Sequence, residues 1–236
     1  MNILLIAGHG QGDPGASANG YIEADLTREL ALKIKTQIKA FADVTVFDTQ
    51  KNMYRYLKSG NTFDFSPYDY VVEIHFNAGI SANAKNDKTT TGCEILVHKN
   101  EAGVSVEKAI LENISSIGFK NRGIKRRSDL QNMNIVHKSG ISYALIETCF
   151  IDDNDDMKLY ISKKDAVASA IAEGIMKGFG IISTPSELTT ANDIVGKLAD
   201  RGIITDKNLW LEKLQNDTNS YWLARKCVNY IIKRHL

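Results

Sequence analysis

Four residues, well separated along the chain, have side chains that together could perform metal-assisted hydrolysis: His9, Glu23, His75 and Glu147. His9 and His75 each come at the end of an apolar run that is typical of a buried strand, and Glu23 opens a long amphipathic segment. The carboxyl ends of parallel strands meet at one edge of a sheet, so we expect these three side chains to lie close together. Two imidazoles and one carboxylate form the ligand set of a catalytic zinc ion, which keeps a fourth position for water.

Glu147 is the candidate for the proton transfers that such a hydrolysis needs. It lies in the apolar run Ser142–Phe150, where an unpaired carboxylate is energetically costly. Burial raises the pKa of a carboxyl group towards the range in which it can take up and release protons near neutral pH. The spacing alone also permits structural roles, because a glutamate in the first helical turn is favoured by the helix dipole without any metal.

The glycine-rich loop after the first strand allows a second interpretation. Gly10, Gly12 and Gly15 match the spacing of the dinucleotide-binding fingerprint, and Asp48 could serve as the ribose-binding acid. The fingerprint glycines should open a helix directly, however, whereas Pro14 and further polar residues intervene here. Asp48 also lies 33 residues after Gly15, where about 20 are expected. A Rossmann-type nucleotide-binding enzyme is therefore the weaker alternative.

The segments that must position these residues alternate between strand and helix patterns. Strands are predicted at residues 3–6, 43–48, 68–75, 92–98 and 142–150, and helices at residues 21–41, 50–60, 104–117 and 166–179. This alternation predicts an α/β fold with three layers, in which helices flank a mainly parallel sheet. Residues 120–127 and 152–156 are predicted to be a basic loop and an acidic loop.

The pattern changes after residue 180. We expect a catalytic domain over residues 1–180, a linker over 181–187 and a small all-helical domain over 188–236. The helices of this small domain are predicted at residues 190–201, 206–216 and 219–233. Gly202 is expected to end the first of them, and Asp206 to cap the second.

The composition excludes several classes of protein. The 236 residues are 43% hydrophobic and have a formal net charge of +1, which argues against a dominant role on nucleic acid or on a membrane surface. The basic segment 120–127 has no interleaved aromatic residues to stack on bases, so it is either a solvated face or a contact for an anionic ligand. The three cysteines are too few and too widely spaced for a disulfide framework. No stretch approaches the roughly 18 apolar residues of a membrane span.

Four motifs, taken in order, resemble those of the zinc-dependent N-acetylmuramoyl-L-alanine amidases that are often called amidase type 3. They are Ala7-Gly-His-Gly-Gln-Gly-Asp-Pro-Gly15, Glu23, His75-Phe-Asn-Ala78 and Glu147-Thr-Cys-Phe-Ile151. The segments 92–94 and 121–130 also resemble parts of this family, and the match covers roughly residues 1–180. Cys149 and Asp153 depart from the family pattern, which has glycine and asparagine there.

The resemblance implies that His9, Glu23 and His75 bind one zinc ion per chain and that Glu147 is the catalytic carboxylate. We therefore expect a peptidoglycan hydrolase that uses a zinc-activated water to cut the amide bond between N-acetylmuramic acid and L-alanine, in bacterial cell lysis. The expected substrate contacts are Asn77, Glu94 and Arg126. A non-catalytic wall-binding module on an amidase fold is the other interpretation.

The start of the chain has no pattern of a signal peptide, and this feature together with a small appended domain resembles a phage or prophage endolysin. Such an enzyme is made in the host cytoplasm and acts at the cell wall after its release, for which we expect a holin. Residues 188–236 are expected to bind secondary wall polymers, with dimerisation as the alternative. The sequence leaves open the oligomeric state, the host and its type of peptidoglycan.

Overall fold

The computed structural model describes residues 1–39, 41–80, 85–180, 191–200 and 202–216. Contacts within the chain separate two compact units, Met1–Ile182 and Ser183–Leu236. Among the described helices, none combines the length and the apolar character that crossing a membrane requires.

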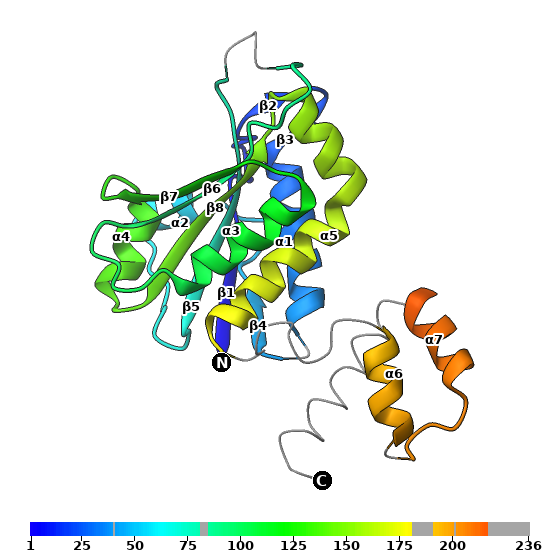
Figure 1. The fold of residues 1–236 in the computed structure, drawn as a ribbon. Helices are drawn as coiled ribbons and strands as arrows, with labels where there is room; N and C mark the ends of the chain where they lie inside the picture. The colour runs from blue at the N-terminus through cyan, green and yellow to red at the C-terminus, as the bar shows by residue number, and fades with distance from the viewer. Residues whose placement is uncertain (40, 81–84, 181–190, 201, 217–236) are drawn as a thin grey trace. The chain divides into compact units, whose positions relative to one another are not determined.

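A six-stranded sheet forms the centre of the unit Met1–Ile182 (Figure 1). Its strands, in spatial order, are β4 (Asp43–Val46), β1 (Asn2–Ala7), β5 (Tyr70–Asn77), β8 (Ser142–Phe150), β6 (Cys93–His98) and β7 (Asn121–Arg127). All neighbouring pairs are parallel except β6 and β8, which are antiparallel. The predicted mainly parallel sheet is confirmed. The reversal brings the amino ends of β6 and β7 to the same edge as the carboxyl ends of β1, β5 and β8.

Helices cover both faces of this sheet, which confirms the three layers (Figure 1). One face packs against α1 (Glu23–Ile38), α3 (Ser105–Ile117) and α5 (Asn154–Gly178). The other packs against the shorter helices α2 (Met53–Lys58) and α4 (Gln131–Lys138). Successive residues of a strand point to opposite faces, so Val72 of β5 joins the first core and Val71 joins the second.

A small antiparallel hairpin determines where α1 begins. It pairs β2 (Ser17–Ala18) with β3 (Tyr21–Ile22), and the Glu23 backbone N–H donates to the Ala16 carbonyl. This hairpin was not predicted. Glu23 is the first residue of α1, where its charge suits the helix dipole. The helix is held by the buried side chains Leu26, Leu30, Ile34 and Ile38.

The predictions of two loops, at residues 120–127 and 152–156, are wrong. The basic segment forms β7, an edge strand that pairs in parallel with β6. Lysine and arginine suit such an edge because their charges oppose pairing with a further strand. The same residues remove the alternation of apolar and polar side chains by which a strand is predicted from sequence. The acidic segment opens α5, where the Asp153 carboxylate accepts hydrogen bonds from the backbone of Asp155 and Asp156. Helix α4 was not predicted.

The unit that begins at Ser183 contains the described helices α6 (Ala191–Asp200) and α7 (Lys207–Asn216). Gly202 follows α6 with φ of 68°, and the Asp206 carboxylate accepts a hydrogen bond from the Leu209 backbone N–H at the start of α7. Both features agree with the sequence prediction. The predicted linker and the predicted helix at residues 219–233 lie outside the described residues.

Candidate metal centre

The loop after β1 holds His9 in a conformation that few residues adopt. His9 has φ of 61°, and Gly10, Gly12 and Gly15 also have positive φ. The Arg28 guanidinium donates hydrogen bonds to the carbonyls of Gly8 and His9, which fixes the backbone there. Hairpin β2–β3 separates this loop from α1. The glycines therefore do not open a helix, as a dinucleotide-binding loop requires.

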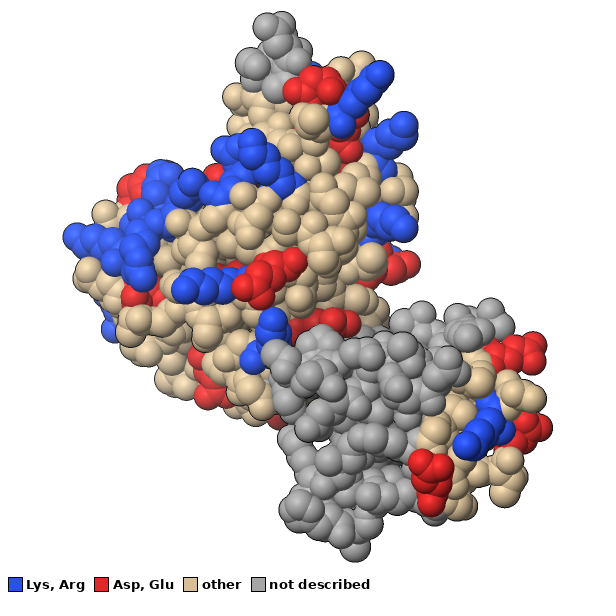
Figure 2. Space-filling model, viewed as in Figure 1, with Lys and Arg blue, Asp and Glu red and all other residues tan. Residues whose placement is uncertain are grey.

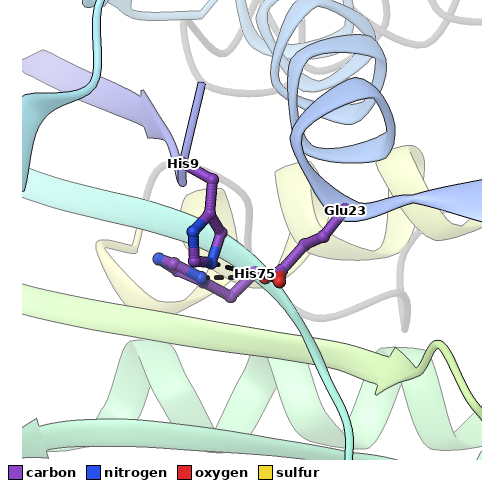
Figure 3. Close-up of side chains that lie close together, drawn as sticks. All are labelled: His9, Glu23 and His75. Carbon is purple, nitrogen blue, oxygen red and sulfur yellow. Dashed lines mark hydrogen bonds and ion pairs between the residues drawn. The ribbon is translucent and has the colours of Figure 1, made fainter. Parts of the chain in front are cut away.

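The side chains of His9, Glu23 and His75 converge at the edge of the sheet (Figure 3). One Glu23 oxygen, Oε2, lies 3.1 Å from His9 Nε2, and the other, Oε1, lies 3.0 Å from His75 Nδ1. One ligand atom from each residue can be chosen so that all lie within 4.8 Å of one another. The structure thus brings together the three residues that the sequence singled out, and they come from β5, α1 and the loop after β1.

Each histidine also has a carboxylate partner on its other ring nitrogen. His9 Nδ1 lies 3.0 Å from Asp13 Oδ2, which accepts a hydrogen bond from Asn52 as well. His75 Nε2 lies 3.1 Å from Glu73 Oε1. Metal-ligating histidines in proteins are commonly oriented in this way by a carboxylate, which fixes the tautomer and directs the free nitrogen at the metal.

Glu73 was not predicted as a site residue, although its position in an apolar strand could have indicated a role. It is buried in β5 two residues before His75, so the two side chains share a face of the strand. The Tyr143 hydroxyl donates to Glu73 Oε2 at 2.6 Å, and the Asn132 amide donates at 2.9 Å. A carboxylate within an otherwise apolar strand needs such partners, and here it anchors His75.

The electrostatics of the group suit a bound cation. Burial opposes ionisation of Glu23, but hydrogen bonds from both histidines and from the Phe76 backbone N–H hold its pKa well below the usual range. Burial alone would lower the pKa of His75, yet contact with Glu23 and Glu73 raises it well above the usual value. The carboxylates therefore create a negative field at the point where the three side chains meet. Protons on the imidazoles or a metal ion can neutralise this field.

Two glycines leave the space that this arrangement needs. A Cβ atom on Gly15 would lie 2.6 Å from Glu23 Oε2 and 2.7 Å from the His9 ring. A Cβ atom on Gly8 would overlap the His75 ring. The donor set of two nitrogens and one carboxylate is that of a catalytic zinc site. The residues present therefore fit a metal ion.

Glu147 lies beside this group, on the neighbouring strand. It is in register with His75 across β5 and β8, and with Glu94 across β8 and β6. Its Oε2 atom is buried and has no hydrogen-bond partner among the described residues. Burial raises the pKa of Glu147 to about 7, as the sequence predicted in direction. A group with this pKa can accept and return a proton near neutral pH.

Of the three expected substrate contacts, the structure places Asn77 and Glu94 together and Arg126 apart from them. The Asn77 amide donates to Glu94 Oε1 at 3.2 Å, and both residues lie at the edge of the sheet that carries Glu147. Arg126 lies apart from them, because it is in register with Val97, whose side chain packs in the core beneath α3. The Arg126 guanidinium donates to the carbonyls of Lys99 and Glu101. The roles of all three residues stay predictions.

Comparison with known proteins agrees with this fold. Residues 3–177 match the model of the N-acetylmuramoyl-L-alanine amidase family, and the chain belongs to that family. It is 27% identical to the probable autolysin PH of Staphylococcus aureus over 223 residues, which are 87% of this chain and 45% of that protein. It is 26% identical to the endolysin of Bacillus phage SPP1 over 182 residues, which are 76% of this chain and 65% of that protein. The chain thus spans less than two thirds of either relative.

Solved amidase structures share the fold. An N-acetylmuramoyl-L-alanine amidase from Clostridium difficile 630 superposes with a TM-score of 0.59 at 24% identity, over 76% of this chain and 95% of that one. The catalytic domain of CwlV from Bacillus (Paenibacillus) polymyxa gives 0.61 at 19% identity, over 77% and 99%. These structures share the fold, and membership of the amidase family supports amidase activity and cell-wall hydrolysis at the level of the family.

Proposed function

We propose that this chain hydrolyses the amide bond between N-acetylmuramic acid and L-alanine in peptidoglycan, with one zinc ion bound by His9, Glu23 and His75. The observation that carries the proposal is the convergence of these three side chains beside Glu147, whose buried Oε2 has no partner among the described residues. Membership of the amidase family supports the same assignment.

The residues divide the chemistry between them. When bound, zinc would polarise the scissile carbonyl and lower the pKa of a water molecule to about 7. Glu147 accepts a proton from the attacking water and then donates it to the amine of L-alanine as that amine leaves. Asp13 and Glu73 keep the two imidazoles in the orientation that directs one nitrogen of each towards the shared metal position.

Removal of the metal tests the proposal on the complete chain. Purified Gram-positive cell walls with a covalently attached dye should release dye when treated with the protein. Chelation should abolish the release, and added zinc should restore it. Full release by protein whose zinc content has been measured as negligible would contradict the proposal.

A methyl group on Gly15 should disturb the metal site directly. The Gly15→Ala variant places Cβ 2.6 Å from Glu23 Oε2, so we expect it to weaken zinc binding by roughly 10- to 100-fold, the range seen when the surroundings of metal ligands are altered. Titration with zinc in competition with a chromophoric chelator measures this affinity.

Gly12→Ala is the matched control for this change. Gly12 belongs to the same loop and also has positive φ, so the backbone strain is similar. Its Cβ would meet only the end of the Arg55 side chain, at 3.5 Å. Equal loss of zinc affinity in both variants would show that strain in the loop, and not contact with Glu23, is responsible.

The proposal extends to the biological setting. We infer that the protein acts in bacterial lysis, as an endolysin that is made in the host cytoplasm and reaches the wall after release, because the chain is similar to a phage endolysin. Residues 188–236 would then hold the enzyme on the wall through its secondary polymers. Deletion of these residues should weaken sedimentation of the protein with purified walls, and unchanged sedimentation would contradict the role.

A further inference from the structure

Arg122 of β7 lies at the edge of the sheet that carries Glu147. Its Nε atom donates to Glu94 Oε2 at 2.9 Å, and its guanidinium carbon lies 4.8 Å from the centre of the Phe150 ring. The other oxygen of Glu94 accepts from the Asn77 amide, and Glu94 is in register with Glu147. Four strands, β5, β6, β7 and β8, therefore contribute to one connected group beside the proposed catalytic carboxylate.

We infer that Arg122 binds a carboxylate of the stem peptide, the one on the residue that follows L-alanine, and so determines which peptides the enzyme prefers. This inference rests on the proposed function. Among the described residues, only Nε of Arg122 has a hydrogen-bond partner, so both terminal nitrogens are left to donate. A guanidinium with two parallel N–H groups matches the geometry of a carboxylate.

The contacts of Arg122 hold this group ready for a ligand. Glu94 fixes the direction of the guanidinium, and the ring of Phe150 supports its plane. The side chain is about one third exposed, at 33%, so a ligand can reach it. A side chain that is ordered before binding loses less entropy when it binds, which favours affinity.

Charge explains why the site needs an arginine here. The Glu94 carboxylate would repel a peptide carboxylate at this position if Arg122 did not neutralise it. Beyond Arg122, lysine and arginine side chains gather along β7 (Figure 2), and among them Lys125 and Arg127 are exposed. The edge strand thus offers the positive surface that attracts a peptide carrying carboxylates.

The substrate has free carboxylates on only one side of the scissile bond. The lactyl carboxyl group of the sugar is consumed in the amide bond, whereas the stem peptide retains carboxylates of its own. A cavity of about 380 Å³ is lined by His9 and His75 themselves, together with residues that include Asp13, Glu73 and Asp129. Its described lining contains no lysine or arginine to bind a carboxylate, so this cavity suits the uncharged sugar, and the peptide is assigned to the side of Arg122.

Two defined substrates test the inference. Both are N-acetylmuramoyl tripeptides of L-alanine, γ-linked D-glutamate and L-lysine, and they differ only in whether the α-carbon of glutamate bears a carboxylate or a carboxamide. The unaltered chain should cleave the carboxylate form with a kcat/KM at least roughly tenfold higher than that for the carboxamide form, which is the ratio that a hydrogen bond to a charged group provides. Arg122→Gln should lose this preference through a raised KM for the carboxylate form alone. Arg122→Lys should retain part of it, because the charge remains but the planar fork does not.

Lys108→Gln is the control, since it removes a positive charge from an exposed position on α3, outside the group around Arg122. It should keep the preference of the unaltered chain. An equal loss of activity on both substrates in Arg122→Gln would assign Arg122 a structural role and overturn the inference, as would equal cleavage of both substrates by the unaltered chain. If the unaltered chain cleaves neither substrate, the proposed function itself fails.

Discussion

Replacement of Glu147 by glutamine is expected to lower kcat on peptidoglycan by roughly 10²- to 10⁴-fold, the usual contribution of a general acid–base residue. Glutamine has the same shape but cannot accept a proton from water or return one to the leaving amine. The stability of the protein should be preserved, because burial already raises the pKa of Glu147 to about 7 and its Oε2 lacks a partner among the described residues. Dye release from labelled walls measures the activity.

The zinc content distinguishes proton transfer from metal binding in this variant. Because Glu147 is assigned to proton transfer, Glu147→Gln should retain about one zinc ion per chain by elemental analysis. A variant that loses both zinc and activity would make Glu147 a ligand instead. A variant with full activity would remove it from the mechanism.

The second large effect is expected for His9→Ala, which should bind zinc far more weakly than the unaltered chain and lose hydrolysis with it. We expect a loss of affinity beyond the roughly 10- to 100-fold that changes around metal ligands produce. The His9 side chain is one quarter exposed, at 25%, so its removal disturbs the core less than removal of His75 would. Zinc per chain and dye release should fall together.

His137→Ala is the control for the loss of an imidazole. His137 lies on α4, where its ring stacks on that of His98 with centroids 3.6 Å apart, away from the three converging residues. This variant should keep its zinc and its activity. Full zinc binding by His9→Ala, with His137→Ala unchanged, would contradict the assigned ligand set.

The core of the fold could be predicted from the sequence because hydrophobic periodicity and topology determine it together. Apolar runs identified β1, β5 and β8, and the rule that parallel strands end at one edge placed His9 and His75 beside each other. The hairpin β2–β3 escaped prediction because two-residue strands show no periodicity. Helix α4 escaped for a related reason: its eight residues give too few turns for a clear pattern.

The basic edge strand shows what a sequence pattern cannot supply. The register between β6 and β7 shifts between Cys93 and Ile95, and Arg122 then contacts Glu94. Arg126, in contrast, is in register with Val97, whose side chain packs in the core beneath α3. The sequence alone could not indicate which of the two arginines, Arg122 or Arg126, lies near the site. That depends on an irregularity in the pairing of β6 with β7.

Mass spectrometry of the fragments that the complete chain releases from purified Gram-positive peptidoglycan tests the central claim most directly. Hydrolysis beside Glu147 at a zinc ion bound by His9, Glu23 and His75 should yield stem peptides with new free amino groups on L-alanine, and glycan strands of unchanged length. Glu147→Gln should yield the new amino groups at a rate lowered by the same roughly 10²- to 10⁴-fold, and no other cleavage. New reducing sugar ends or opened peptide cross-links, without free L-alanine amino groups, would contradict the assignment of this chain as an amidase that cuts between sugar and peptide.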